Sequence, residues 1–374
     1  MRTVLYLNAV GEISGAERSL LGLLEALDRE AWRPVVAAPE GALLREAHAR
    51  GAAVMPVALA PLRRPRTPAD GLALLGALRA GWREVADTVR VAQPDLLHAN
   101  TTAAMSYALR LRVPRIWQVR DLVPLGAPGA VLYRQASRVA AISAAVRDSL
   151  LPYADDNGAK IRLLPPAVDT ARFRPVEDKA SLRATLGLPT DVPLIGLIAQ
   201  FVPWKRHSLF LDALVRLRDR PWHAVLAGAE LHGDRAYADG LRARITAPPL
   251  AGRVTWLPWQ ADAIPLLATL DMLALTSEHE PFGRVLIEAL ACGVPAVAAA
   301  EGGPTEILRH HETGLLVPPD ANAFADALST LLDDPARRAA LGTAGRMDVE
   351  ARFSVEHQRA ALAALYDEVL GESA

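Results

Sequence analysis

The chain has 374 residues, of which 51% are hydrophobic and 22% are charged, and its formal net charge is -1. This length suits two domains, and the composition is that of a globular protein rather than a disordered one. The near-neutral charge gives no general basic field, so we expect no nucleic-acid partner. A single cysteine excludes an internal disulfide framework and is typical of a reducing compartment. The apolar run at 4–10 is too short to span a bilayer and lacks the layout of a secretory signal, so we expect a cytoplasmic protein.

Short apolar runs alternate with longer amphipathic segments in the first half of the chain. Strands are predicted at residues 4–8, 35–38, 96–98, 116–119, 139–142 and 161–164. Helices are predicted near 16–27, 68–92 and 101–111. Strand and helix alternating at this spacing predict a parallel sheet covered on both faces.

A proline-punctuated stretch from Pro165 to Pro189 interrupts the pattern, which then restarts. Strands are predicted at 194–199, 224–227, 254–257, 272–275 and 297–299, and helices near 206–218, 235–246, 283–292 and 321–333. A last helix is predicted near 355–371. We therefore expect two doubly wound domains, 1–170 and 171–354.

The strongest candidate for a binding site is the segment from Glu278 to Leu290, which joins a predicted strand to a predicted helix. Glu280 lies in the loop, and Glu288 lies on the second turn of a helix that we expect to begin near Gly283. Free N–H groups at a helix start bind anions, and carboxylates there bind hydroxyl groups or face developing positive charge. From chemistry alone, ordinary helix-start and surface acids explain the pattern equally well.

Two more loops of the second half carry residues suited to an anionic ligand. Lys205 follows a predicted strand and can hold a diphosphate as a point charge, although a solvated lysine is the more common case. Gly302 and Gly303 permit close backbone approach, and Pro304 suits a first helical position. Plain turn chemistry explains this glycine pair equally well.

The loop from Gly11 to Glu17 follows the first predicted strand, but it is not a dinucleotide fingerprint, which argues against a nicotinamide dehydrogenase. We find neither a nucleophile elbow nor metal-ligand spacing, so we expect no metal. Four polar residues lie at or just past strand ends, and each alone is more often structural than catalytic: His98, Asn100, Arg120 and Asp121.

Taken together, these segments resemble retaining glycosyltransferase family 4, whose members have the GT-B fold. The resemblance runs through nearly the whole chain, from the Gly-Ala-Glu loop at 15–17 through the Val-Asp pair at 168–169 to Lys205. Its most specific part is the pair Glu280 and Glu288 with a Phe-Gly between them. The implied fold is an α/β architecture in which two doubly wound Rossmann-like domains face each other across a cleft.

The resemblance implies a retaining hexosyl- or glycosyltransferase that moves a sugar from a nucleotide-diphosphate sugar, with UDP as the default, and needs no metal or other cofactor. Glu280 would be the catalytic carboxylate that contacts the donor sugar. Lys205 would hold the pyrophosphate, and Glu288 the ribose hydroxyls. The residues implied for donor binding are Gly15, Gln200, Lys205, Phe282, Gly283, Arg284, Val285 and Glu288.

Four positions depart from the family's common pattern. Ser14 stands where glycine is usual, Gln200 replaces the arginine of the lysine loop, and Pro-Ala at 166–167 replaces Asn-Gly. Arg120 stands where a histidine is usual. Losing one charged contact to a diphosphate costs about 1.5–3 kcal/mol, or about ten- to hundredfold in affinity. We expect Arg120 to replace part of this charge and to belong with the catalytic residues.

Two other interpretations of the protein's function remain open. The protein is alternatively a catalytically impaired nucleotide-sugar-binding protein, which Gln200 and Arg120 favour, while Lys205 and the two glutamates oppose it. It is alternatively a related two-domain enzyme such as a sugar-nucleotide epimerase, which would form product without an acceptor. A pyridoxal-dependent phosphorylase would need a Schiff-base lysine, for which only Lys205 is well placed.

The acceptor is expected to bind to the first domain, with His98, Asn100 and Asp121 on the acceptor side. The last helix, within 355–374, is expected to cross back to that domain. The sequence identifies neither the sugar nor the linkage, the oligomeric state or the acceptor, which is a glycan, a lipid-linked molecule or a small molecule.

A basic stretch at 61–66 precedes a helix with apolar residues at Leu72, Leu75, Leu78, Trp82 and Val85. This pattern suits a lipid-linked acceptor or the inner face of a membrane, although packing on its own sheet is the more common role.

Overall fold

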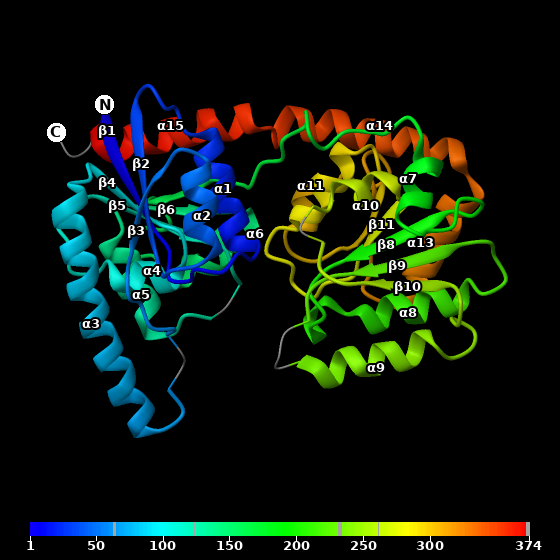
Figure 1. Ribbon diagram of the computed structural model, residues 1–374, viewed down its shortest axis with the longest axis horizontal. Helices are drawn as coiled ribbons and strands as arrows, with labels where there is room; N and C mark the ends of the chain where they lie inside the picture. The colour runs from blue at the N-terminus through cyan, green and yellow to red at the C-terminus, as the bar shows by residue number, and fades with distance from the viewer. Residues whose placement is uncertain (63–64, 123, 231–233, 261, 372–374) are drawn as a thin grey trace. The chain divides into compact units, whose positions relative to one another are not determined.

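The computed structural model describes residues 1–62, 65–122, 124–230, 234–260 and 262–371. The chain divides into two compact units (Figure 1). Unit 1 consists of Met1–Ala167 together with Val355–Ala374, and unit 2 consists of Val168–Ser354. Each unit is built on one parallel sheet with helices packed against it, so the predicted α/β class with two Rossmann-like domains is confirmed.

Unit 1 contains seven strands: β1 (Arg2–Leu7), β2 (Trp32–Ala38), β3 (Ala53–Pro56), β4 (Leu96–Ala99), β5 (Arg115–Val119), β6 (Arg138–Ala141) and β7 (Ile161–Leu163). Its helices are α1 (Gly15–Ala26), α2 (Ala42–Ala49), α3 (Pro68–Ala92), α4 (Thr102–Tyr107), α5 (Ala127–Gln135), α6 (Ala144–Leu150), η1 (Leu151–Tyr153) and α15 (Val355–Gly371). The sheet order is β3-β2-β1-β4-β5-β6-β7, and all neighbouring strands are parallel.

Unit 2 contains six strands: β8 (Leu194–Ile198), β9 (His223–Ala227), β10 (Val254–Leu257), β11 (Met272–Leu275), β12 (Ala296–Ala299) and β13 (Leu315–Val317). Its helices are α7 (Lys179–Thr185), η2 (Pro203–Lys205), α8 (His207–Arg216), α9 (Arg235–Ile245), α10 (Ile264–Thr269), α11 (Arg284–Ala291), α12 (Pro304–Ile307), α13 (Ala321–Asp333) and α14 (Pro335–Arg352). The sheet order is β10-β9-β8-β11-β12-β13, again with parallel neighbours.

In both sheets the direction of winding reverses at the strand that comes first in the chain. β1 lies between β2 and β4, and β8 lies between β9 and β11. Open parallel sheets bind their ligands beyond the carboxyl ends of the strands at this reversal. The loops after β1 and β4, and those after β8 and β11, are therefore the places where each unit is expected to hold functional residues.

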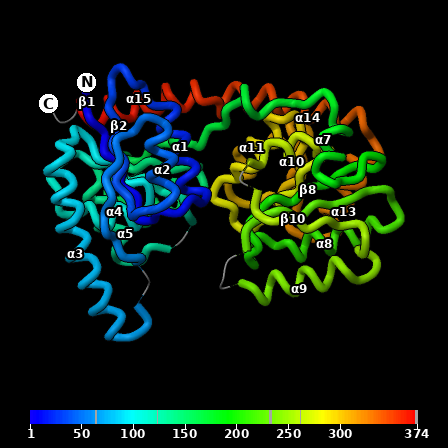
Figure 2. Tube along the Cα trace, in the orientation of Figure 1, coloured from blue at the N-terminus to red at the C-terminus, as the bar shows by residue number. Residues whose placement is uncertain are grey.

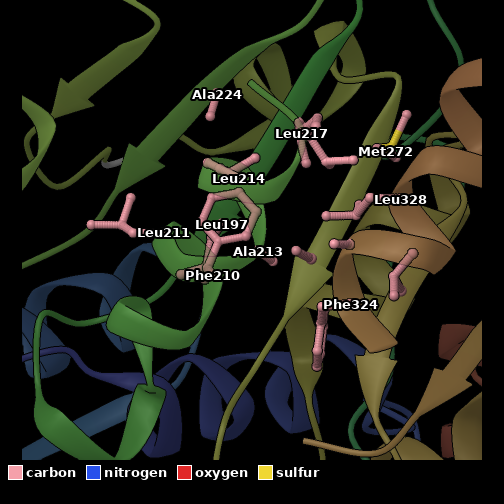
Figure 3. Close-up of a cluster of buried hydrophobic side chains, with 14 of the residues drawn as sticks. Leu197, Phe210, Leu211, Ala213, Leu214, Leu217, Ala224, Met272, Phe324 and Leu328 are labelled. Carbon is pink, nitrogen blue, oxygen red and sulfur yellow. The ribbon is translucent and has the colours of Figure 1, made fainter. Parts of the chain in front are cut away.

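The core of unit 2 lies where α8 and α13 pack against the sheet. Phe210 and Leu214 of α8, Phe324 and Leu328 of α13, and Leu197 of β8 are all completely or almost completely buried (Figure 3). Burying one such side chain contributes about 1.5–3 kcal/mol relative to leaving it in water. Strands that are covered on both faces have continuous apolar sequences, which explains why these strands could be predicted from the sequence.

Helix α15 follows unit 2 in sequence and completes the core of unit 1. It packs beside α1 (Figure 2), and its buried side chains include Leu362, Leu365 and Tyr366. The Tyr366 hydroxyl donates a hydrogen bond to the hydroxyl of Tyr6 in β1 at 2.9 Å, and the Tyr366 ring meets Trp32 edge-on. A segment distant in sequence thus fills one side of the first sheet.

Some elements differ from the sequence-based expectation. Strands β3 and β13 and the helices α2, α5, α6, α7, α10 and α14 were not predicted, and the helix expected at 101–111 ends at Tyr107. β3 has four residues, all at least partly exposed, and β13 is only three residues long. Neither strand therefore forms a long apolar run. The predicted basic stretch at 61–66 includes residues 63 and 64, which lie outside the described residues. In the described ranges, no helix has the length and apolar character needed to cross a bilayer.

Candidate functional site

The loops after β8 and β11 meet in an ion pair. Nζ of Lys205, in η2, lies 2.6 Å from Oε2 of Glu280, and the two side chains are only 13% and 10% exposed. Nζ also lies 3.9 Å from the centre of the Trp204 ring, which is within cation–π distance. The structure therefore brings together, at the reversal point of the second sheet, the two residues expected to bind the donor pyrophosphate and the donor sugar.

Hydrogen bonds to backbone carbonyls fix these two loops against each other. The hydroxyl of Thr276, directly after β11, donates to the carbonyl of Lys205 at 2.9 Å. The amide of Glu278 donates to the carbonyl of Trp204 at 2.7 Å. Thr276 is fully buried, so its hydrogen bond is shielded from water. The backbone of Lys205 is therefore held in place by the residues that follow β11.

The glycine pair after β12 holds the loop that carries Glu280. The amide of Gly303 donates to the carbonyl of Glu280 at 2.8 Å. A Cβ atom at Gly303 would lie 2.3 Å from Cα of Phe282, and one at Gly302, where φ is +65°, would lie 2.4 Å from the Glu280 carbonyl oxygen. Since both obstacles are backbone atoms, only glycine permits this close approach. Gly302 and Gly303 therefore help to hold the Glu280 loop in place and do not merely form a turn.

Helix α11 begins beside this loop. Its N-cap is Gly283, whose φ of +100° is a glycine conformation. The ring of Phe282 is buried and meets Phe353 edge-on, so it anchors the start of the helix. Val285 lies on the first turn and is partly exposed. A guanidinium nitrogen of Arg284 lies 2.7 Å from Oε1 of Glu288, so these two predicted donor-binding residues are paired with each other.

A second cation lies next to Lys205. Arg206, in a left-handed conformation, forms ion pairs with Glu278 at 3.0 Å and Glu301 at 3.2 Å. Arg206 was not among the residues predicted for the site, although its position directly after Lys205 was a visible signal in the sequence. Gln200, the predicted donor-binding residue after β8, is partly exposed, and its carbonyl accepts from the amide of Val202 at 2.9 Å.

In unit 1, a chain of hydrogen bonds connects the loop before α1 to Arg120. The buried carboxylate of Glu17 accepts from the amide of Ser14 and from the side-chain amide of Asn8, both at 3.0 Å. Oδ1 of Asn8 accepts from Nδ2 of Asn100 at 2.9 Å. Oδ1 of Asn100 in turn accepts from two guanidinium nitrogens of Arg120, at 2.6 and 3.1 Å. Asn8 and Asn100 directly follow β1 and β4, so the chain crosses the reversal point of the first sheet.

The placement of Asn100 and His98 does not support direct contact with an acceptor. Asn100 is fully buried and positions Arg120. His98 is also fully buried, with Nδ1 2.9 Å from the hydroxyl of Tyr366 and Nε2 2.9 Å from Oε1 of Gln118. Burial lowers the pKa of His98 to about 3, and the charge of Arg120 acts in the same direction, while the hydrogen bond to Oε1 of Gln118 acts against both. His98 is therefore a neutral core residue that joins α15 to the sheet.

Asp121 and Gly15 remain accessible on unit 1. Asp121 is exposed at the end of β5, yet partial desolvation raises the pKa of its carboxyl, as does the negative charge of Glu17, while Arg120 opposes both. Gly15 is exposed at the start of α1, and a Cβ atom there would meet nothing within 4 Å. Arg120 is 8% exposed. Asp121 and Gly15 are therefore the most accessible of the residues predicted for a site in unit 1.

Asn8, Glu17 and Trp204, like Arg206, are residues that sequence reasoning did not assign to a site. For Asn8, the signal was an amide at the carboxyl end of the first predicted strand. For Glu17, it was the position three residues after Ser14, where a glutamate closes a capping box. Among the described residues, no group of three or more His, Cys, Asp or Glu side chains is arranged to hold a metal ion.

Two family models match the chain in sequence. The model described as Glycosyl transferases group 1 matches residues 178–348, and the one described as Glycosyltransferase Family 4 matches residues 13–172. Together they cover nearly nine tenths of the chain, one on each unit.

The chain is also similar to curated glycosyltransferases. It is 35% identical over 224 residues to the D-inositol 3-phosphate glycosyltransferase of Kineococcus radiotolerans, an alignment covering 55% of this chain and 52% of that protein. It is 30% identical over 208 residues to the lipopolysaccharide core biosynthesis mannosyltransferase LpsB of Rhizobium meliloti, covering 54% and 59%. The chain spans about half the length of the curated relatives it matches.

A solved structure extends the likeness to both units. The Anabaena protein HepE, crystallised with UDP and glucose, is 27% identical, with a TM-score of 0.85 over 98% of this chain and all of that one. A sucrose-phosphate synthase from Thermosynechococcus elongatus, at 23% identity and a TM-score of 0.82, shows the same fold. With both family models matched and the fold shared, the chain belongs to glycosyltransferase family 4, whose members have the GT-B fold.

Proposed function

We propose that the protein transfers a sugar from a nucleotide-diphosphate sugar to a hydroxyl group of an acceptor, with retention of the anomeric configuration and without a metal ion. The observation that carries this proposal is the Lys205–Glu280 pair at the reversal point of the second sheet. A cation and a carboxylate held 2.6 Å apart suit the two halves of such a donor, its diphosphate and its sugar. UDP is the default nucleotide, supported by the UDP and glucose bound to the related HepE.

In the proposed reaction, the bond between the anomeric carbon and the diphosphate oxygen breaks, and a bond from that carbon to the acceptor oxygen forms. The proton of the acceptor hydroxyl moves to the leaving phosphate oxygen. Lys205 neutralises charge that develops on the diphosphate, and the N–H groups at the start of α11 receive phosphate or sugar oxygens. Glu280 faces the positive charge that develops at the sugar carbon.

Arg120 of unit 1 is proposed to supply further positive charge to the reaction. Its guanidinium is fixed by Asn100, which holds it at the reversal point of the first sheet. A fixed guanidinium is suited to phosphate oxygens because little rotamer freedom is lost when it binds. Glu288 is proposed for the ribose hydroxyls, and its pairing with Arg284 must then loosen to admit them.

The first test measures the heat of binding of UDP, GDP, ADP and dTDP to the wild type and to Lys205→Ala. The proposal expects one nucleotide to bind selectively and to lose about ten- to hundredfold in affinity in the variant. If none of the four binds, the donor site is not functional on its own, and an active transferase is no longer the favoured reading.

The second test separates transfer from its alternatives. The wild type and Glu280→Ala are incubated with the sugar form of the nucleotide that binds, with and without EDTA, and nucleotide release is followed. Proton NMR of the freshly released sugar, with water as acceptor, reports the anomeric configuration. Inversion, dependence on metal, or release that survives in Glu280→Ala would each contradict one part of the proposal. A new sugar nucleotide formed without release would indicate an epimerase.

A further inference from the structure

Helix α3 is packed against unit 1 over only part of its length. Its 25 residues run from Pro68 to Ala92, and its buried residues begin at Gly81. No residue from Pro68 to Ala80 is buried, and Leu72 and Leu75 are 72% and 48% exposed. In Figure 1 this first half runs away from the strands of unit 1. The apolar residues of this helix therefore differ in their surroundings: Val85 is buried against unit 1, whereas Leu72 is exposed.

The exposed leucines and two arginines form one stripe along the helix. Leu72, Leu75, Arg79 and Arg83 follow one another at spacings of three and four residues, which places them on one face. The buried residues of α3 lie on the opposite face. The stripe therefore points away from the sheet of unit 1, with leucines at its N-terminal end and arginines further along.

The charge around this stripe is positive. Arg110 stacks its guanidinium on the ring of Trp82 at 4.6 Å, next to the stripe. The three acidic residues of α3 are engaged elsewhere. Asp70 accepts from the amides of Arg66 and Thr67 before the helix, Glu84 accepts from the amide of Ala58, and Asp87 pairs with Arg90 at 2.7 Å. In the described part of the chain, the ion pairs of α3 include Arg90 but neither Arg79 nor Arg83.

A half-helix of this kind is marginal in water. It contains Gly71 and Gly76, each of which costs about 1 kcal/mol in a helix relative to alanine. This half continues into the packed second half but has no buried face of its own, and most of the stability of helices in proteins comes from packing. A surface that covers the leucines and attracts the arginines would stabilise it.

We propose that the first half of α3 docks on an anionic lipid surface, with Leu72 and Leu75 entering the apolar boundary and Arg79, Arg83 and Arg110 lying among the phosphate headgroups. Two leucines are too little apolar area for a specific protein interface, which needs about 800 Å² on each partner. Reversible membrane binding needs only a small apolar wedge combined with several cations. This surface lies outside the proposed donor site, so it can be tested independently of transfer.

The test is co-sedimentation of the whole protein with phosphatidylcholine vesicles, with and without an equal part of phosphatidylglycerol. The wild type is expected to bind the anionic vesicles at low salt and to be released as salt rises. The double variant Leu72→Gln and Leu75→Gln should lower the partition coefficient about tenfold or more. Arg79→Gln and Arg83→Gln should each lower it about fivefold.

Two matched variants control for general effects of exposure and charge. Val91→Gln changes a residue that is 74% exposed on the same helix but near its other end, and Arg90→Gln removes an arginine already paired with Asp87. Both should sediment with vesicles like the wild type, and far-UV circular dichroism with thermal unfolding confirms that each variant folds.

Three results would overturn the proposal. The first is no binding of the wild type to anionic vesicles at low salt, and the second is binding that the leucine variants leave unchanged. The third is a dimer, seen by sedimentation equilibrium, that the leucine variants dissociate, since a second copy would then be what covers α3.

Discussion

Replacing Glu280 by glutamine removes the negative charge opposite Lys205 but keeps a side chain of similar size that still accepts a hydrogen bond. The Lys205 ammonium is then largely buried without a counter-ion. Two charges about 4 Å apart attract by about 4 kcal/mol at an effective dielectric constant of about 20, and desolvation offsets a large part of this. Because both side chains are mostly buried, we expect Glu280→Gln to lower the free energy of unfolding by about 2 kcal/mol.

The same change should strengthen the binding of a nucleoside diphosphate. In the wild type, a diphosphate that reaches Lys205 competes with Glu280 for the ammonium, whereas in Glu280→Gln it has no anionic competitor. UDP carries no sugar, so it loses no sugar contact in the variant. If half of the lost pairing energy returns on binding, UDP binds about 1 kcal/mol, or about fivefold, more tightly. Turnover of the sugar nucleotide should fall at the same time.

Urea unfolding measures the first effect and titration calorimetry with UDP measures the second. The matched control is Glu301→Gln, which removes a carboxylate from the neighbouring pair with Arg206. UDP affinity that is unchanged or weaker in Glu280→Gln would refute the competition between the pair and the diphosphate. Equal strengthening in Glu301→Gln would show that the effect comes from the general field of the loop.

Three other predictions concern the support of the site and the core. His98 is neutral in the folded protein, with a pKa lowered to about 3, while the unfolded chain titrates near 6.5. The contribution of neutral His98 to the free energy of unfolding is therefore complete above about pH 6.5. It is lost by up to about 1.4 kcal/mol per pH unit as the pH falls toward about 3. In His98→Gln, the urea midpoint should therefore fall less steeply with decreasing pH than in the wild type. Gly303→Ala should destabilise unit 2 by about 2 kcal/mol or more and abolish UDP binding, because a Cβ there meets the backbone of the Glu280 loop, whereas Gly240→Ala, with open space, should be tolerated. Arg120→Ala should lower turnover about ten- to hundredfold, and unchanged donor affinity and turnover would exclude a role for Arg120.

The sequence predicted the central strands of both sheets because they are buried on both faces and read as apolar runs. It also predicted the loops that carry Lys205 and Glu280, since both directly follow such strands. It did not predict β3, which is short and half-exposed, nor α14, whose arginines and glycines weaken any apolar period. These elements depend on their neighbours in the fold for their stability.

The sequence did not predict which side chains of the site contact each other, because these contacts also depend on neighbours in the fold. That Glu280 pairs with Lys205 depends on how two loops 75 residues apart are joined, by the Thr276 hydroxyl and the Glu278 amide donating to carbonyls of the lysine loop. His98 and Asn100 looked like acceptor residues because they follow a strand end. Their neighbours Tyr366 and Asn8 are distant in the chain, so the sequence could not show that they are enclosed.

The completion of unit 1 by α15 has a consequence for the order of events during synthesis. Unit 2 is contiguous in the chain, so all of it leaves the ribosome before α15 does. Domains generally fold as units as they emerge, so the second sheet can reach its final form while the first still exposes the groove that Leu362, Leu365 and Tyr366 will fill. The N-terminal half is therefore the later one to mature, and a nascent chain stalled anywhere before residue 355 would present an open hydrophobic groove to chaperones or to other chains.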